Sequence, residues 1–300
     1  MITLVFISLR VLPGDVTVVI LGEQGYTLEK AATLRRQLGL DRPLHQQYVK
    51  FLWDLLHGDL GNSLITGREV AADLRMQLLR TAELTLLAVP LGTLVGIPLG
   101  AIAALRRNSI SDIAVSLISL VGISVPLFAS AYVLVYFFSI KLPLLPSAGF
   151  VPLMDDPVQH LRRIILPTIC LMFWPAAVAM RMMRSSLLEV MHEDYIRTAR
   201  AKGLREPLVI IRHAFRNALI PVVSIVGLQI GTLFAGAVVA ESIFSWPGMG
   251  LYLYDGLLRR DLPVVQGAII VMAVIFSVAN LLVDLLYSVL DPRIRMEISQ

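Results

Sequence analysis

The stretch Asp194–Leu204, with the sequence DYIRTARAKGL, interrupts two long apolar segments of the chain. Asp194 can accept hydrogen bonds from the first free N–H groups of a helix, the residues that follow are good helix formers, and Gly203 can end the helix with a left-handed backbone. On such a helix Ile196, Ala199 and Gly203 lie along one face, and the cations point elsewhere. We predict a short helix whose apolar ridge fits a groove on a partner. The alternative is a solvated loop that anchors this side of the protein by charge alone.

The composition is that of an integral membrane protein. Of 300 residues, 56% are hydrophobic and 16% are charged, and the mean hydropathy is +0.75. Polar residues are too few to cover so much apolar surface in a soluble globule. The net charge of +4 would indicate nucleic acid binding in a soluble protein, but here the excess lies in loops between apolar runs. We therefore expect a lipid bilayer as the environment and no nucleic acid partner.

Apolar runs predict five complete membrane spans, at about 82–105, 113–140, 161–180, 218–240 and 263–290. In the first of them glycine recurs at every fourth position from Gly92 to Gly100, which predicts close approach by another helix. In the second, Gly122 and Pro126 are the expected bend points. The expected fold is therefore all-α, with these spans in the core region 82–290.

The N-terminal region is predicted to hold a partial span and an insertion. Residues 1–12 form too short an apolar run to cross a ~30 Å hydrocarbon core, so we expect Met1 to lie inside the first of about six spans of the natural protein. Residues 13–79 are mixed and charged, with helical spacing of apolar residues at 28–38 and 46–56. This segment is predicted to be a water-facing insertion of short helices.

The distribution of lysine and arginine predicts the orientation. Residues 181–216 contain eight Lys or Arg against four Asp or Glu, and Arg106 and Arg107 follow the first complete span. The positive-inside rule places 106–109 and 185–216 in the cytoplasm, and hence 13–79, 141–160 and 241–261 outside. Arg162 and Arg163, at an outer end, act against the rule.

Signatures of an enzyme are absent from the sequence. There is no Gly-x-x-x-x-Gly-Lys-[Ser/Thr] phosphate loop, and the five histidines never form a His-Glu-x-x-His pair. The lone Cys170 can form neither an intramolecular disulfide nor a metal cluster. We expect no catalytic residue, no metal and no cofactor on this chain.

A few polar side chains lie within the predicted spans, where such groups are costly and face protein or a water-filled path. Gln229 and Asn280 are candidates for lining a path, and an interhelical hydrogen bond is the alternative for Gln229. Asp284 is expected to be structural and to pair with Arg181 or Arg184.

Three stretches together resemble one known family. Asp194–Gly203, continued through residues 212–221 (RHAFRNALIP), resembles the "EAA" loop of ABC importer permeases, and in particular the dipeptide, oligopeptide and nickel branch. LPGD at 12–15 and ESIFSWPGMG at 241–250 are similar to further motifs of that branch. RTA stands at 197–199 in place of Glu-Ala-Ala, and the glycine-to-proline spacing is longer than in the general pattern. Both departures are usual in the peptide branch.

The resemblance implies a single permease domain over residues 1–300, in the plasma membrane of a prokaryote. Its implied function is to translocate dipeptides or oligopeptides delivered by an extracytoplasmic binding protein, with nickel or glutathione as alternative cargo. The implied partners are a homologous second permease and two ATPase subunits, which would hold ATP and Mg. The rival from another class is an ion-coupled secondary transporter or channel, for which inverted repeats would be expected and none is visible.

The resemblance also implies two sets of site residues. Those coupling to the ATPase would be Asp194, Tyr195, Ile196, Arg197, Thr198, Ala199, Arg200, Lys202 and Gly203, with Ile196 and Ala199 filling a groove on the ATPase. Those facing the binding protein would be Glu241, Phe244, Trp246, Pro247, Gly248, Gly250, Arg260 and Asp261. The alternative for the second set is an ordinary re-entrant loop with Trp246 and Tyr252 as aromatic anchors at the membrane surface.

Overall fold

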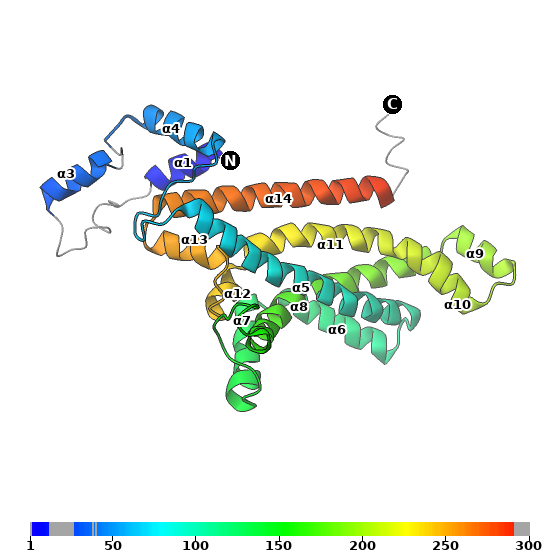
Figure 1. The fold of residues 1–300 in the computed structure, drawn as a ribbon. Helices are drawn as coiled ribbons and strands as arrows, with labels where there is room; N and C mark the ends of the chain where they lie inside the picture. The colour runs from blue at the N-terminus through cyan, green and yellow to red at the C-terminus, as the bar shows by residue number, and fades with distance from the viewer. Residues whose placement is uncertain (1, 12–26, 38, 40, 291–300) are drawn as a thin grey trace, which may run out of the picture. The chain divides into compact units, whose positions relative to one another are not determined.

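A computed structural model describes residues 2–11, 27–37, 39 and 41–290 (Figure 1). In this part of the chain the regular structure is helical, apart from one isolated antiparallel bridge between Asn62 and Glu69. The chain divides into two compact units, Met1–Thr81 with Pro247–Val274 and Ala82–Trp246 with Ile275–Gln300. The LPGD motif at 12–15 and residues 291–300 lie outside the described residues.

The first unit contains the N-terminal helices. The predicted helical segments 28–38 and 46–56 are confirmed as α3 (Leu28–Gln37) and α4 (Leu44–Leu56), and α1 covers Ile2–Val11. Helix α5 (Val70–Leu105) begins well before the predicted start of the span at 82, because residues 70–81 form a helix with one buried side. Val70 and Leu74 are buried there. Helices α13 (Met249–Leu258) and α14 (Leu262–Leu290) follow late in the sequence.

The second unit is built around α8 (Pro157–Val190), with α6 (Ile110–Ser124) and α11 (Arg216–Gly236) in contact with it. Figure 1 shows both neighbours running alongside α8. The remaining elements are shorter: α7 (Leu127–Leu134), η1 (Val135–Lys141), α9 (Asp194–Ala201), α10 (Glu206–Leu208), η2 (Val209–Phe215) and α12 (Val238–Ile243).

Four helical stretches are long and apolar enough to cross a membrane: Val70–Leu105, Pro157–Val190, Glu206–Phe234 and Leu262–Leu282. Ile110–Ser124 and Leu127–Lys141 pass the same test together but are bent by 106°. Proline lacks the N–H that would continue the helix and disfavours a helical residue before it, so the break falls at Val125 and Pro126. The predicted bend at Pro126 is confirmed, whereas the one predicted at Gly122 is wrong, because α6 continues through Gly122 to Ser124. The fold is thus that of an all-α membrane protein.

Helices α5 and α8 approach each other along the glycine stripe, as predicted. A Cβ atom at Gly92 would lie 2.8 Å from the carbonyl oxygen of Met172, and one at Gly96 or Gly100 would clash with the carbonyl oxygen of Ala176 or Met180. Only hydrogen at these positions allows the two backbones to touch. The contacts advance in the same direction along both helices, so α5 and α8 are parallel.

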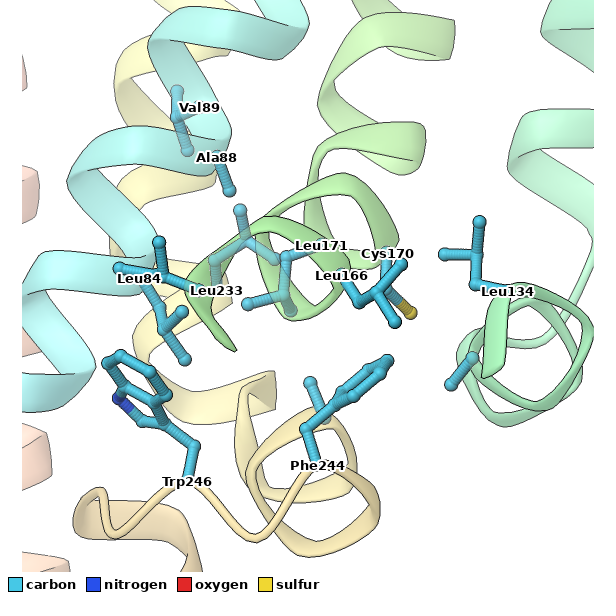
Figure 2. Packing of buried hydrophobic residues seen from close by; sticks show 13 residues of the cluster. Leu84, Ala88, Val89, Leu134, Leu166, Cys170, Leu171, Leu233, Phe244 and Trp246 are labelled. Atoms are coloured by element: carbon cyan, nitrogen blue, oxygen red, sulfur yellow. The ribbon is translucent and has the colours of Figure 1, made fainter. Parts of the chain in front are cut away.

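Two hydrophobic clusters hold the second unit together at the two ends of α8. In the first, which we call the Trp246 cluster, Phe244 and Trp246 point toward Leu166 and Leu84 (Figure 2). The second, the Ile196 cluster, joins the C-terminal turns of α8 to α9, η2 and the start of α11. The two clusters fix the segments that enter and leave the helical core.

Candidate functional site

Helix α9 forms where the sequence predicted it. Gly203 has φ of +77°, so it ends the helix in the left-handed region as expected. The predicted role of Asp194 as the N-terminal cap is wrong. The cap position is occupied by Glu193, whose side chain makes no capping hydrogen bond, and Asp194 lies in the first turn, where its carboxylate accepts a 3.3 Å hydrogen bond from Arg197.

The apolar face of α9 is turned toward its own chain. Ile196 is 0% exposed and Ala199 is 7% exposed, and both belong to the Ile196 cluster with Leu187 and Val209. The prediction that they fill a groove on a partner is therefore wrong for this fold. Burial of a side chain such as Ile196 contributes about 1.5–3 kcal/mol, which anchors α9 to α8 and η2.

The exposed face of α9 is polar and basic. The side chain of Arg197 is 70% exposed, and Thr198, Ala201 and Lys202 are also exposed. Tyr195 is partly fixed, because the side-chain amide of Asn217 donates a 2.8 Å hydrogen bond to its hydroxyl oxygen. A partner that contacts α9 would therefore meet this polar face.

Arg200 holds the turn that follows α9. Its guanidinium donates hydrogen bonds of 2.7 and 3.1 Å to the two carboxylate oxygens of Glu206. These bonds raise the pKa of Arg200 above its usual value. Because the pair is solvent-exposed, it contributes at most about 1 kcal/mol to stability. Its geometric effect is to close residues 202–205 into a fixed loop between α9 and α10.

A buried ion pair joins the end of α8 to the start of α6. Arg184 donates two hydrogen bonds to the carboxylate of Asp112, one of them 2.9 Å long, and Asp112 is buried. The expected partner of Arg184 was Asp284, whose side chain lies outside the described residues; the partner found is Asp112. Sequence reasoning missed Asp112, although Ser109 three residues earlier is the start of a capping pattern, and Ser109 does accept a hydrogen bond from the Asp112 backbone N–H.

The residues before Pro247 that were expected to face a binding protein lie in the protein interior. Glu241, Phe244 and Trp246 are all buried. Trp246 makes edge contacts with Phe150, with the ring centroids 4.8 Å apart, and with His160. Trp246 is therefore not a membrane-surface anchor. Its role in this fold is to close the Trp246 cluster.

Arg162 and Arg163, the two arginines that act against the positive-inside rule, both form hydrogen bonds to backbone carbonyl oxygens. Arg162 donates a 3.1 Å hydrogen bond to the carbonyl oxygen of Leu144, and Arg163 donates one of 2.7 Å to that of Ala148. The Gly149 backbone N–H donates to the Phe244 carbonyl oxygen at 2.8 Å. The two segments predicted to lie outside, 141–160 and 241–246, thus meet at one end of α8.

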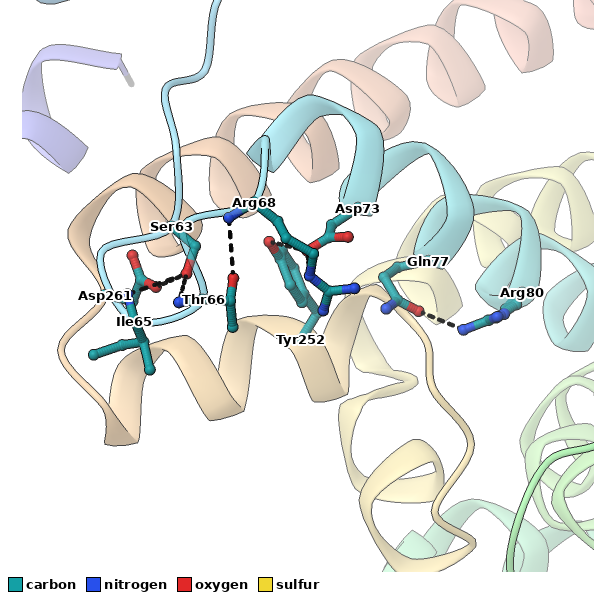
Figure 3. A network of polar contacts seen from close by, with 9 residues as sticks. All are labelled: Ser63, Ile65, Thr66, Arg68, Asp73, Gln77, Arg80, Tyr252 and Asp261. Carbon is teal, nitrogen blue, oxygen red and sulfur yellow. Dashed lines mark hydrogen bonds and ion pairs between the residues drawn. The ribbon is translucent and has the colours of Figure 1, made fainter.

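In the first unit, Asp261 is buried and joins two segments of the chain, so its side chain is not exposed to a binding protein. Its carboxylate accepts a 2.6 Å hydrogen bond from the Ser63 hydroxyl (Figure 3). It also accepts a 3.1 Å bond from the Leu64 backbone N–H. Gly248 and Gly250 are also buried, Pro247 is half-buried, and Arg260 is exposed. Sequence reasoning did not predict the contact between Ser63 and Asp261.

Tyr252 lies beside a second carboxylate of the first unit. Its hydroxyl is 3.5 Å from a carboxylate oxygen of Asp73, which also lies 3.6 Å from Arg68 (Figure 3). Burial, followed by the negative charges of Asp73 and Asp261, raises the pKa of Tyr252 to about 12. Tyr252 is therefore a neutral hydrogen-bonding group and packs within the unit.

Gln229 and Asn280, the two path candidates, differ in burial. Gln229 is 2% exposed, and neither atom of its side-chain amide finds a hydrogen-bond partner among the described residues. The interhelical hydrogen bond considered as the alternative is not formed there. Asn280 is half-buried on α14. Lining of a path by either residue stays a prediction.

The fold is similar to that of chains in solved structures of an ABC transporter. Two inward-facing structures of the MetNI methionine ABC transporter match it with TM-scores of 0.59 and 0.61, each covering 73% of this chain and 96% of the other. Their sequence identities of 18% and 17% show the fold alone.

Comparison of sequences then gives the family. Residues 96–296 match the family described as binding-protein-dependent transport system inner membrane component. The chain is 44% identical to the dipeptide transport system permease protein DppB of Escherichia coli (strain K12), over 97% of this chain and 93% of that protein. It is 42% identical to the di/tripeptide transport system permease protein DppB of Pseudomonas aeruginosa (strain UCBPP-PA14), with the same coverage. The chain therefore belongs to the family of inner membrane components of binding-protein-dependent transport systems.

Proposed function

We propose that this chain is one of two permease subunits of an ATP-driven importer in the plasma membrane of a bacterium, and that its cargo is dipeptides or short oligopeptides. The cargo is supported by the names of the relatives, which are dipeptide and di/tripeptide permeases at 44% and 42% identity over nearly the whole chain. The expected partners are a homologous permease, two ATPase subunits and an extracytoplasmic binding protein. The chemistry of ATP hydrolysis, with Mg, belongs to the ATPase subunits.

The observation that carries the coupling role is the anchoring of α9. The helix is joined in sequence to α8 and α11 and is fixed to both by the buried Ile196 and Ala199. A displacement of α9 would be passed to the helices packed against it, because closely packed helices move together as a rigid body. When the ATPases close on ATP, a shift of α9 would therefore displace the ends of the long helices α8 and α11.

The proposed contact with the ATPase differs from the one that the sequence predicted. The buried ridge is occupied by the chain itself, so the partner would meet Arg197, Thr198, Ala201 and Lys202 on the exposed face. Cations on such a face govern association rate and salt dependence more than affinity. The contact should therefore weaken as the salt concentration rises.

Cargo and coupling are tested together in proteoliposomes that contain the complete importer and its binding protein. We expect uptake of a labelled dipeptide that requires internal ATP and the binding protein, with no uptake of Ni²⁺ or glutathione at equal concentration. ATP-dependent uptake of Ni²⁺ or glutathione, without peptide uptake, would retain the importer and overturn the cargo. Peptide uptake driven by an ion gradient without ATP would overturn the importer itself.

A further inference from the structure

An open groove of about 470 Å³ lies between α6 and α8. It is lined on α6 by Val115, Ser116, Ser119, Leu120 and Ile123, and on α8 by residues 180–182, Arg184 and Ser185. A volume of this size accommodates a small ligand or the polar part of a larger one. Its lining includes none of the residues assigned above to the coupling segment and neither of the path candidates Gln229 and Asn280.

The chemistry of the groove changes along its length. The Asp112–Arg184 pair shows that the start of α6 meets the end of α8, so the two helices run in opposite directions. Near that pair the lining includes Arg181 and Ser185, and farther along it is formed by Leu120 and Ile123. The groove therefore has a polar, basic end and an apolar continuation.

The basic end carries an uncompensated charge. Arg184 is neutralised by Asp112, whereas Arg181 is exposed and has no acidic partner among the described residues. The Ser185 hydroxyl is exposed one turn away on the same helix. A guanidinium and a hydroxyl facing one groove are suited to bind a phosphate group.

The surroundings of the groove are apolar. On α6, three apolar side chains that do not line the groove are between 55% and 57% exposed: Leu117, Ile118 and Val121. Both helices belong to segments long and apolar enough to lie in a membrane. A ligand that matches both the basic end of the groove and its apolar continuation would carry an anionic phosphate at one end and a hydrocarbon chain at the other.

We propose that this groove is a binding site for an anionic phospholipid, whose phosphate contacts Arg181 and Ser185 and whose acyl chain lies along Leu120 and Ile123. The basic end of the groove is the end that the positive-inside rule places in the cytoplasm. Basic pockets between membrane helices at that surface are suited to anionic headgroups. The lipid would hold α6 against α8 beside the segment that leads to α9.

The test is lipid retention by the importer purified from membranes and exchanged into nanodiscs with equal phosphatidylglycerol and phosphatidylcholine. Native mass spectrometry of the complex released from nanodiscs counts the lipid that remains. The variant is Arg181→Gln, and the matched control is Arg107→Gln, which removes one exposed arginine at the same end of the second unit but outside the groove.

We expect the wild-type protein and Arg107→Gln to retain phosphatidylglycerol in preference to phosphatidylcholine. Arg181→Gln should lower that retention about fivefold, the effect of removing about one cationic contact with an anionic lipid. Equal losses in the two variants, or equal retention of both lipids by the wild type, would overturn the site.

A second measurement separates a lipid from a protein occupant. A cysteine at Ser185, in a Cys170→Ala background, is treated with a short bifunctional crosslinker in native membranes. We expect no crosslink to the second permease, because lipid fills the groove. Efficient crosslinking would show that the other subunit covers the groove, and the lipid proposal would fail while the importer function stood.

Discussion

The imidazole of His160 on α8 lies between two oxygen atoms, one of which belongs to the Glu83 carboxyl group on α5. Its Nε2 atom is 2.8 Å from a carboxylate oxygen of Glu83 on α5, and its Nδ1 atom is 2.7 Å from the carbonyl oxygen of Val151. A carbonyl oxygen only accepts, so Nδ1 carries the hydrogen of that bond. The ring of His160 is buried beside Trp246 and Phe150. His160 thus ties α5, α8 and the loop 142–156 together at one end of the second unit.

This relationship predicts a graded response at Glu83. Glu83→Ala should destabilise the protein by about 1–2 kcal/mol, because the buried Nε2 atom loses its partner. Glu83→Gln should cost less, since an amide can either donate to or accept from the ring. The measurement is the apparent melting temperature of the purified protein in detergent. Equal losses for the two variants would show that the side chain acts by packing and not by its hydrogen bond.

We expect substitutions of a buried and an exposed alanine of α9 to have different effects. Ala199→Asp places a charge in the buried Ile196 cluster and should cost about 3 kcal/mol or more, so α9 should detach from α8. Limited trypsin digestion would then cut at Arg197, Arg200 or Lys202 faster than in the wild type. Ala201→Asp, on the exposed face, should leave the digestion pattern unchanged and reduce co-purification of the ATPase subunits.

Ala72→Asp is the control for both alanine variants, because it adds the same charge at an exposed position of α5. It should change neither digestion nor co-purification. Full retention of the ATPases by Ala201→Asp, together with their loss in Ala199→Asp without faster digestion, would contradict contact through the exposed face of α9.

Tyr252 predicts a loss of stability at high pH. Its pKa is raised to about 12 in the folded protein, against about 10 in an unfolded chain. Between these values the unfolded chain releases a proton that the folded protein keeps, so this contribution is complete below pH 10 and is lost as the pH rises toward 12. Tyr252→Phe should remove that part of the pH dependence. The difference in tyrosinate absorbance between the two proteins gives the titration, and ionisation of Tyr252 near pH 10 would contradict it.

The membrane orientation predicts which surface positions are accessible from each side. Single cysteines at Ser147 and Ser245, in a Cys170→Ala background, should react with an impermeant maleimide added outside intact cells or spheroplasts. A cysteine at Ser185 should react only after the membrane is opened. Ser147 and Ser245 are exposed in the structure, so a failure of either position to react from outside would not come from burial. Reaction of Ser185 and Ser245 positions from the same side would refute the orientation.

The break at Pro126 and the C-terminal end of α9 were predictable because they depend on neighbouring residues. Pro126 breaks the second span and Gly203 ends α9, and each effect arises from the local backbone. The glycine stripe also predicted a close helix contact. It could not say which helix would supply that contact, and α8 does.

The errors concern the direction in which side chains point. Ile196, Ala199 and Trp246 were assigned to partner or membrane surfaces, and the structure buries all three within the chain. An apolar face looks the same in sequence whether it packs against its own protein or against another. The choice depends on which helices are already adjacent, and a short local pattern contains no information about that.

The sequence by itself determined the membrane class, the approximate positions of the long apolar helices, the helical state of residues 194–201 and the resemblance to importer permeases, because composition and hydrophobic periodicity are properties of contiguous residues. The tertiary structure decided the pairings of Asp112 with Arg184, 72 residues apart, and of Ser63 with Asp261, 198 residues apart. Such pairings form only when packing has brought distant segments together, since a buried polar group is stable only beside a partner at hydrogen-bonding distance.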